Sequence, residues 1–240
     1  MYSADIKPIE RNFLPADFTI TTWDTLEPYF TQLLDRAINS KADLEHWLKD
    51  SSELEAVISE DACWRQVRMT CDTENKALEE AFNYFYVEIA PKMQPYADKL
   101  NRKLVACAYT KELDADKYFT YLRSIQKSID LFREANIPIM SELSVMQQQF
   151  GQIAGKMTVE VEGKEYTLQQ AAKFLESSDR KLREEVYLKI QNRRYQDREA
   201  LNKLFDQLVA KRHQLALNAD FNNYRDYKFK ELGRFDYTPQ

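Results

Sequence analysis

Apolar side chains recur every three or four positions along most of this chain, with few breaks between the runs. Near the N-terminus the stripe consists of Leu26, Phe30, Leu33 and Ala37. This spacing places the side chains on one face of an α-helix, where they can be buried together. The chain has only 4 Gly and 7 Pro among 240 residues, which favours long helices and few tight turns. The pattern predicts a mainly α fold, an antiparallel array of helices.

Capping residues predict where the helices begin. A side-chain oxygen that accepts a hydrogen bond from the first helical turn satisfies a backbone N–H that would otherwise lack a partner. On this ground we expect helix starts at about Thr22, Ser40, Ser52, Thr73 and Asp114. Residues 1–20 are expected to form an extended lead-in, with breaks at Pro8 and Pro15, that anchors Phe13 and Leu14 on the core.

Proline and glycine predict where the helices end. Pro91 and Pro95 should break or kink the helix that follows Thr73. We expect Asn136 and Pro138 to end a later helix, and Gly151 and Gly155 to stop the next one. Two more helices are expected at Leu168–Leu175 and at about Arg180–Leu217, the second with a stripe that begins at Leu182, Val186 and Ile190.

One β-hairpin is expected at about residues 157–167. Met157, Val159 and Val161 alternate with polar residues, which is the pattern of a half-buried strand. Glu162-Gly163 supplies a turn, and residues 164–167 return as a second short strand. Thr167 and Gln170 have the spacing of a capping box, so a helix should start at Leu168.

Charge and hydropathy exclude several classes of function. The net charge of −5 argues against nucleic acid as a partner, because nucleic-acid-binding domains are usually basic. The longest apolar run, residues 104–109, is far short of the roughly 20 residues that a membrane span needs. The N-terminus has no apolar segment of the signal-peptide type.

The cysteines predict a reducing compartment. Cys63 and Cys71 are expected on one helix, about 12 Å apart at 1.5 Å of rise per residue, which is too far for a disulfide. With Cys107 they should form three free thiols, and we expect the protein in the cytoplasm.

The segment from Ser178 to Thr238 carries a family resemblance. Its matching features are the Ser178-Asp179-Arg180 entry into a helix, the run Leu208-Val209 to Arg212 with Leu215-Ala216, the sequence FNNYRDY at 221–227, and Arg234 with Tyr237-Thr238. These residues resemble the segment that leads into the catalytic domain of oligoendopeptidase F and its thimet-oligopeptidase-like relatives. The resemblance is specific over about residues 150–240, and the order of the upstream elements agrees with it.

The resemblance implies a helical, clam-like zinc endopeptidase that encloses short peptides in a deep channel. Such chemistry needs a His-Glu-x-x-His helix, in which two His bind the metal and the Glu polarises a water molecule. This sequence has 2 His and no such motif. We therefore assign no catalytic or metal-binding residue, leave the substrate-binding residues undefined, and expect no zinc in this segment.

The resemblance also suggests a division of the chain. We expect an N-terminal helical region at 1–110, an oligopeptidase-F-type N-terminal domain with the hairpin at 111–178, and the start of a truncated catalytic domain at 179–240. The alternative to a truncation is a natural short protein.

Other chemistry-bearing residues have simpler interpretations. Asp43 and His46 stand at i and i+3, but zinc wants three or four ligands, so His46 is expected on a helix surface beside Trp47. His213 near a helix C-terminus suits the helix dipole. The acidic pairs Glu79-Glu80 and Glu184-Glu185 are expected on solvated faces.

Three consecutive aromatic residues, Tyr84, Phe85 and Tyr86, must cover several faces of one helix. At least one of them should look outward or into a groove. Core packing and the wall of a peptide channel are both open interpretations.

Two functions remain. In the first, the chain is the N-terminal, non-catalytic portion of a zinc-dependent oligoendopeptidase, forms one wall of the channel for oligopeptides and should be inactive alone. In the second, it is a free-standing helical interaction module that binds a partner through an apolar stripe. A reading frame that continues beyond Gln240 into His-Glu-x-x-His would favour the first. If the chain is only one half of a clam-like enzyme, it should also expose apolar surface and self-associate.

Overall fold

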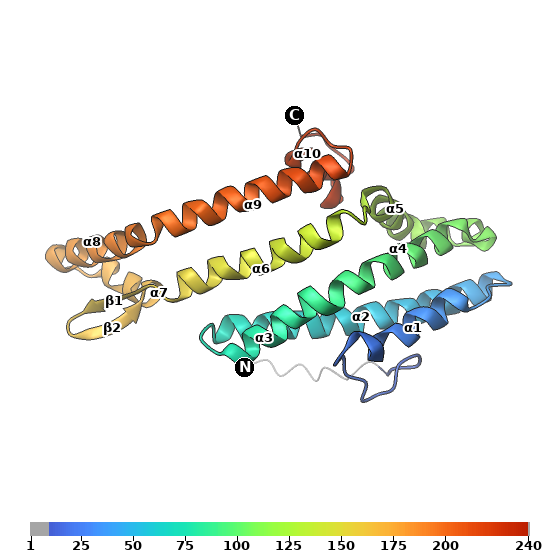
Figure 1. The fold of residues 1–240 in the computed structure, drawn as a ribbon, viewed down its shortest axis with the longest axis horizontal. Helices are drawn as coiled ribbons and strands as arrows, with labels where there is room; N and C mark the ends of the chain where they lie inside the picture. Colours follow the sequence, from blue (N-terminus) through green and yellow to red (C-terminus); the bar gives the residue numbers. More distant parts are fainter. Residues whose placement is uncertain (1–9, 240) are drawn as a thin grey trace.

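The computed structural model describes residues 10–239, and the part of the expected lead-in at residues 1–9 lies outside the described residues. The described chain is mainly helical with one two-stranded sheet (Figure 1). The first half contains α1 (Trp23–Asp35), α2 (Lys41–Cys71), α3 (Lys76–Tyr84), the π-helical turn η1 (Phe85–Ile89), α4 (Ala90–Ala106), the 3₁₀ turn η2 (Ala108–Glu112) and α5 (Ala115–Leu131). The second half contains α6 (Asn136–Gly155), β1 (Thr158–Val161), β2 (Lys164–Thr167), α7 (Leu168–Ala171), the 3₁₀ turn η3 (Ala172–Glu176), α8 (Arg180–Gln196), α9 (Arg198–Asn218) and α10 (Tyr224–Glu231).

Helix α6 lies in the middle of the molecule. Figure 1 shows it between α9 on one side and the α3–α4 helix on the other, and it packs on both. The hairpin and α7 lie near the C-terminal end of α6, and α10 lies at the other end of the molecule against α9 and α5. The apolar residues of α6 join the clusters with α9 and the hairpin, and none of them joins the cluster of the first half.

The buried apolar residues form three clusters. The largest joins α1, α2, η1, α4 and α5 around the fully buried side chains of Trp47, Leu26 and Leu104. A second cluster holds α6, α9 and α10 together, and a third packs the hairpin and α7 on α8. The polar face of α6 lies where the first cluster meets the other two.

The lead-in is fixed by one carboxylate. Glu53 of α2 accepts hydrogen bonds from the backbone N–H groups of Asn12, Phe13 and Leu14, at 2.8, 3.0 and 2.8 Å. Leu14 is buried and Phe13 packs against the first cluster, so the expected anchoring of these two side chains is confirmed.

The hairpin agrees with its prediction. Val159 pairs with Tyr166 and Val161 with Lys164 in an antiparallel register. Glu162 and Gly163 both have positive φ, 53° and 76°, as a type I′ turn requires. The strand residues Met157, Val159 and Val161 are buried, and Thr167 caps α7 through the expected box with Gln170.

Several predicted helix starts are wrong. The helix does not restart at Ser52, because α2 runs unbroken from Lys41 to Cys71 and buries this region against the first cluster. The cap of α3 is Asn75, whose side chain accepts from the N–H groups of Ala77 and Leu78, rather than Thr73. Ala37 falls beyond the end of α1 and is exposed, so it does not continue the stripe. The starts at Thr22, Ser40 and Asp114 are confirmed.

Most of the predicted breaks are also wrong. Pro91 and Pro95 do not stop the helix, because a π-helical turn precedes Pro91 and the chain continues as α4. Asn136 and Pro138 begin α6 instead of ending α5, since proline is tolerated in a first turn. Gly151 lies inside α6, and only Gly155 stands at its end. The expected helix from Arg180 is two helices, which meet at Asp197.

Candidate functional site

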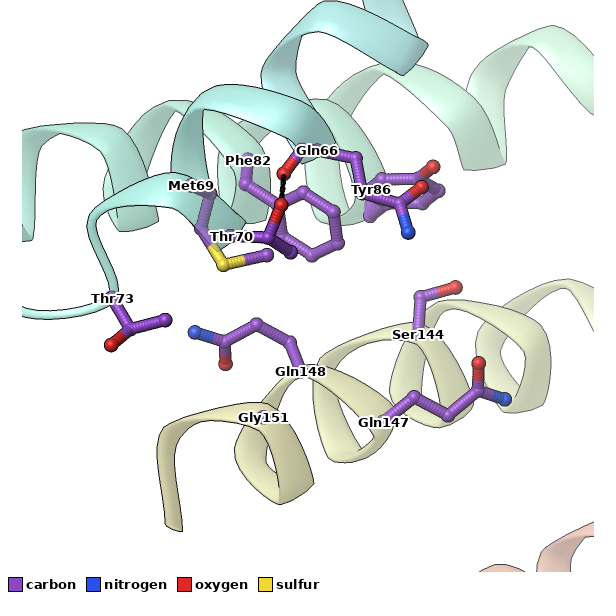
Figure 2. A pocket seen from close by; sticks show the side chains of 10 residues that line it. All are labelled: Gln66, Met69, Thr70, Thr73, Phe82, Tyr86, Ser144, Gln147, Gln148 and Gly151. Atoms are coloured by element: carbon purple, nitrogen blue, oxygen red, sulfur yellow. Dashed lines mark hydrogen bonds between the residues drawn. The ribbon is translucent and has the colours of Figure 1, made fainter. Parts of the chain in front are cut away.

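A pocket lies between the C-terminal half of α6 and the helices α2, α3 and η1 (Figure 2). Its volume is about 190 Å³, enough for one amino-acid side chain with part of its backbone. The residues that line it are Gln66, Met69, Thr70, Thr73, Phe82, Tyr86, Ser144, Gln147, Gln148 and Gly151.

The α6 side of the pocket is a stripe of small and polar residues. Ser141, Ser144, Gln148, Gly151 and Gly155 follow one another at intervals of three and four, so they share one face of the helix. This face turns to α2 and η1, while Leu143 and Met146 on another face pack in the cluster with α9. The spacing was visible in the sequence, but the two glycines were interpreted as helix stops, so the stripe was missed.

Gln148 is the buried polar group of this site. Its residue is 7% exposed, and its Nε2 has no hydrogen-bond partner among the described residues. Figure 2 shows the side chain reaching from α6 toward the end of α2, near Met69 and Thr73. A buried amide donor without a partner costs about 1–3 kcal/mol, so a group that accepts from it would be bound favourably.

The opposite wall is shaped by η1. In this π-helical turn Ala90 N–H donates to Phe85 O, five residues back. In the same pattern the carbonyl of Tyr86 would accept a hydrogen bond from the N–H of residue 91, but Pro91 has no N–H. Ser141 Oγ of α6 donates to Tyr86 O instead, at 2.6 Å. One hydrogen bond thus ties α6 to the wall that carries the Tyr86 ring.

The pocket is electrically neutral. None of the described residues that line it carries a charge. Burial raises the pKa of the Tyr86 phenol, with a smaller contribution from Cys63, so this side chain stays protonated at neutral pH. Met69, Phe82 and the Tyr86 ring give the pocket an apolar wall opposite the Gln148 amide. The arrangement suits a neutral ligand that has an apolar part and an amide or carbonyl group.

A second cavity, of about 180 Å³, lies within the first cluster between α1, α2 and α4. Apolar side chains such as Phe30, Leu54 and Met93 dominate its lining. No unpartnered buried donor or acceptor of the described residues points to a ligand there. Glu55, Ser59 and Ala97 in its lining are exposed, so it is a depression that opens to the surface between the helices.

The histidines do not form a site. His46 is exposed on α2, and its Nε2 lies 3.6 Å from Asp50 Oδ2, while Asp43 accepts from the backbone N–H of Asn39. Asp50 itself is buried and is held by Arg36 at 2.5 Å. His213 is exposed on α9.

The side chains that the structure describes do not fit a zinc ion. Within residues 10–239, no three His, Cys, Asp or Glu side chains gather closely enough to hold a metal. The acidic pairs are no exception: Glu184 and Glu185 are exposed, and Glu185 pairs with Lys189 at 2.6 Å.

The three aromatic residues at 84–86 lie in three different environments. Phe85 is buried in the first cluster, Tyr84 is exposed and Tyr86 lines the pocket. The expectation that at least one of them looks outward or into a groove is therefore confirmed.

A second surface of interest is the outer face of α9. Phe205, Val209, His213 and Leu217 stand four residues apart, so they form a stripe that winds along the helix next to the buried Leu204 and Leu208. Phe205 is 61% exposed, and Val209 and Leu217 are exposed as well. We call Phe205, Val209 and Leu217 the α9 stripe. The sequence interpretation found only the buried face of this helix.

Two further features concern the setting of the protein. The cysteines Cys63, Cys71 and Cys107 are all free, and the first two share α2 as expected. Within the described residues, no helix combines the length and apolar character that crossing a membrane would require.

The fold is shared with solved peptidase structures. A structure of an oligoendopeptidase F superposes with a TM-score of 0.86 at 22% identity, and an oligoendopeptidase F from Bacillus anthracis str. Ames with 0.86 at 18%. PZ peptidase A, solved with an inhibitor, gives 0.85 at 20% identity. These matches cover 93%, 95% and 93% of this chain but only 40%, 43% and 40% of the others, in the same order. The chain thus spans about two fifths of their length.

The family follows from the sequence match. No curated protein matches this sequence. Residues 13–132, however, match the family model described as the peptidase M3 N-terminal domain. This range contains α1 to α5 with the whole first cluster and the aromatic wall of the pocket. The chain belongs to the peptidase M3 family, whose N-terminal domain it contains.

Proposed function

We propose that this chain is the N-terminal, non-catalytic portion of a zinc-dependent oligoendopeptidase and forms one wall of its substrate channel. The observation that carries the proposal is the difference between the aligned share of this chain and the aligned share of its solved relative. The peptidase fold extends over 93% of this chain, yet that stretch amounts to 40% of the solved relative. Residues 10–239 offer no set of three potential zinc ligands, and in our proposal the metal and the attacking water belong to another part of the peptidase.

Two surface features support a role in substrate binding without catalysis. The α9 stripe is apolar and exposed, as expected of a helix face that packs against further structure. The pocket beside α6 offers neutral, partly apolar surface of the kind that short peptides contact. The channel wall would bind and orient an oligopeptide and exclude folded proteins by size, while hydrolysis occurs at the metal supplied elsewhere.

The same reasoning extends to partners and location. Oligopeptides are the substrates we assign to the whole enzyme, and zinc is its metal. The free thiols of Cys63 and Cys71 are exposed, which supports a reducing compartment such as the cytoplasm. The chain alone should self-associate through the α9 stripe.

The test is peptide hydrolysis by the isolated chain. Internally quenched short peptides are incubated with the purified chain and added zinc, beside a His46→Ala/His213→Ala double variant that lacks both imidazoles. We expect both proteins to give the same rate as zinc alone. Zinc-dependent cleavage by the wild-type chain that the double variant lacks would place the chemistry inside this chain and contradict the proposal.

A free-standing interaction module is the second candidate, and the α9 stripe is the observation that favours it. The two functions differ in what the stripe contacts. In the peptidase it packs permanently on the remainder of the enzyme, whereas in a module it remains open for a partner. The coding sequence that follows residue 240 separates them, because only the peptidase requires a His-Glu-x-x-His helix there.

A further inference from the structure

The pocket beside α6 combines three independent features. It is a cavity of about 190 Å³, its lining carries no charge among the described residues, and a buried donor, Gln148 Nε2, has no partner there. A packing defect in an apolar core would lack the donor, and a site for an ion would carry charge. The combination is that of a binding site for a neutral polar group.

The chemistry of the lining selects the ligand. An amide has both an acceptor and a donor, so it can pair with both atoms of the Gln148 carboxamide. Met69, Phe82 and the Tyr86 ring form the apolar wall, which suits a compact aliphatic side chain. A free carboxylate or ammonium group would lose its hydration without meeting a countercharge in the pocket.

We propose that this pocket is a binding site for one apolar residue of a peptide, held by a hydrogen bond between Gln148 Nε2 and a main-chain carbonyl. The inference deepens the proposed function and rests on it only for the choice of a peptide as the source of the amide. The carbonyl accepts from Gln148, and the side chain lies against Met69, Phe82 and Tyr86. The exposed residues Gln66, Thr70 and Gln147 form the mouth through which the rest of the peptide leaves.

Gly151 of α6 lines the pocket and has no side chain to fill it. A Cβ atom built on Gly151 would meet no other atom within 4 Å, so a side chain at this position begins in open space. A larger residue there would occupy the space that the ligand needs. Position 151 therefore allows the pocket to be blocked while the fold is kept.

The experiment follows binding directly and needs no catalysis. The ¹⁵N-labelled chain is titrated with N-acetyl-leucinamide, while the side-chain NH₂ signals of Gln148 and the backbone amide of Gly151 are recorded by NMR. For a ligand of this size the dissociation constant should be on the order of 1–10 mM. Two further titrations use N-acetyl-leucine, which has a carboxylate, and leucinamide, which has an ammonium group. Both should bind at least about fivefold more weakly.

Variants assign the binding to this pocket. Gln148→Met keeps the length of the side chain but removes the donor, and it should weaken binding about tenfold. Gln149→Met makes the same change on the neighbouring, exposed residue and should alter binding less than about twofold, because Gln149 does not line the pocket. Gly151→Leu should abolish the saturable shifts, and circular dichroism checks that it is folded.

The outcomes are decisive in either direction. Saturable shifts at Gln148 and Gly151 that depend on both residues establish the site. Equal binding by Gln148→Met and the wild type, tighter binding of the carboxylate, or no shifts at either residue at about ten times the expected dissociation constant would overturn it. None of these results depends on hydrolysis, so failure here and failure of the proposed peptidase role are distinguishable.

Discussion

At the scale of single residues, Glu53 shows how one side chain positions a segment. Its carboxylate accepts three backbone N–H groups of the lead-in. Burial by itself would raise the pKa of Glu53, but the hydrogen bonds from Asn12, Leu14 and Phe13 together lower it below its ordinary value. The unfolded chain therefore takes up a proton at higher pH than the folded chain does.

This arrangement predicts a stability that depends on pH. Because the pKa in the folded state is depressed, the contribution of Glu53 is complete above the unfolded pKa of about 4.3 and is lost as the pH falls through the folded value. Glu53→Gln should lower the free energy of unfolding by about 1–2 kcal/mol at pH 7. Urea denaturation at pH 7 and pH 3 measures the difference, which should shrink at the lower pH.

A matched substitution controls for the loss of a charge. Glu60 is exposed on the same helix, and Glu60→Gln should change stability by less than about 0.5 kcal/mol at either pH. A Glu53→Gln variant whose deficit is the same at pH 3 as at pH 7 would show that the charge of this carboxylate does not hold the lead-in.

Residue-scale prediction succeeds where the determinants are local. The caps at Ser40 and Thr167 were predicted because their partners lie three residues away in the sequence. Gln148 could not be recognised as a site residue, because its burial depends on helices α2 and α3, about 70 positions earlier in the chain.

At the scale of elements, the contact between η1 and α6 is the one that shapes the pocket. Ser141→Ala removes the donor to Tyr86 O and should lower the free energy of unfolding by about 1 kcal/mol. In a Pro91→Ala background residue 91 has an N–H of its own, so the same Ser141→Ala change should cost much less. A double-mutant cycle by chemical denaturation measures this coupling.

The control for the cycle is Ser144, one turn further along the same face. Its Oγ bonds to Met140 O within α6, at 3.0 Å, so Ser144→Ala should show no coupling to Pro91→Ala. Additive effects of Ser141→Ala and Pro91→Ala would contradict our account of how Tyr86 O is satisfied.

The glycines of α6 give a second prediction at this scale. Gly151 has open space at its Cβ position, whereas a Cβ on Gly155 would lie 3.0 Å from Thr73 Oγ1. Gly151→Ala should therefore stabilise the protein by about 0.5–1 kcal/mol, through the better helix propensity of alanine. Gly155→Ala should gain less, and adding Thr73→Ala should restore part of the gain, as thermal unfolding can show. Equal gains for the two single variants would disprove a close approach at Gly155.

Element-scale prediction failed for one physical reason. Pro138 and Gly151 were expected to end helices, and Pro91 to break or kink one, since each weakens a helix in isolation. In the structure a π-helical turn accommodates Pro91, the first turn of α6 tolerates Pro138, and packing on both sides supports α6 through Gly151. Helices that pack on neighbours continue through residues that would stop them in a peptide. The hairpin depended on local turn chemistry, and its prediction was correct.

At the scale of the whole molecule, the α9 stripe is the exposed apolar surface that we propose packs against the remainder of the peptidase. The isolated chain should form dimers or larger species whose fraction grows with concentration, as light scattering can measure. Phe205→Glu with Val209→Lys places charges on the stripe and should give a monomer.

The control is an equally exposed aromatic residue on another helix. Phe119 of α5 is 60% exposed, and Phe119→Glu should leave the association unchanged. A wild-type chain that remains monomeric at every concentration tested would contradict the role of the α9 stripe.

Whole-molecule prediction relied on the resemblance more than on patterns. The stripes predicted a helical array, which many unrelated folds share. The oligoendopeptidase F resemblance supplied the family, and the match of residues 13–132 confirms it. The α9 stripe was missed because both faces of that helix are apolar, and only the structure shows which one is buried.

The central claim is that this chain shelters a peptide but does not hold the catalytic metal, and zinc stoichiometry tests it most directly. Equilibrium dialysis of the metal-free chain against micromolar zinc, followed by elemental analysis, measures the zinc retained per chain. We predict well below one ion per chain, because the two histidines lie on separate helices and no three potential ligands of residues 10–239 gather together. One tightly held zinc per chain, lost in the His46→Ala or His213→Ala variant, would contradict the claim.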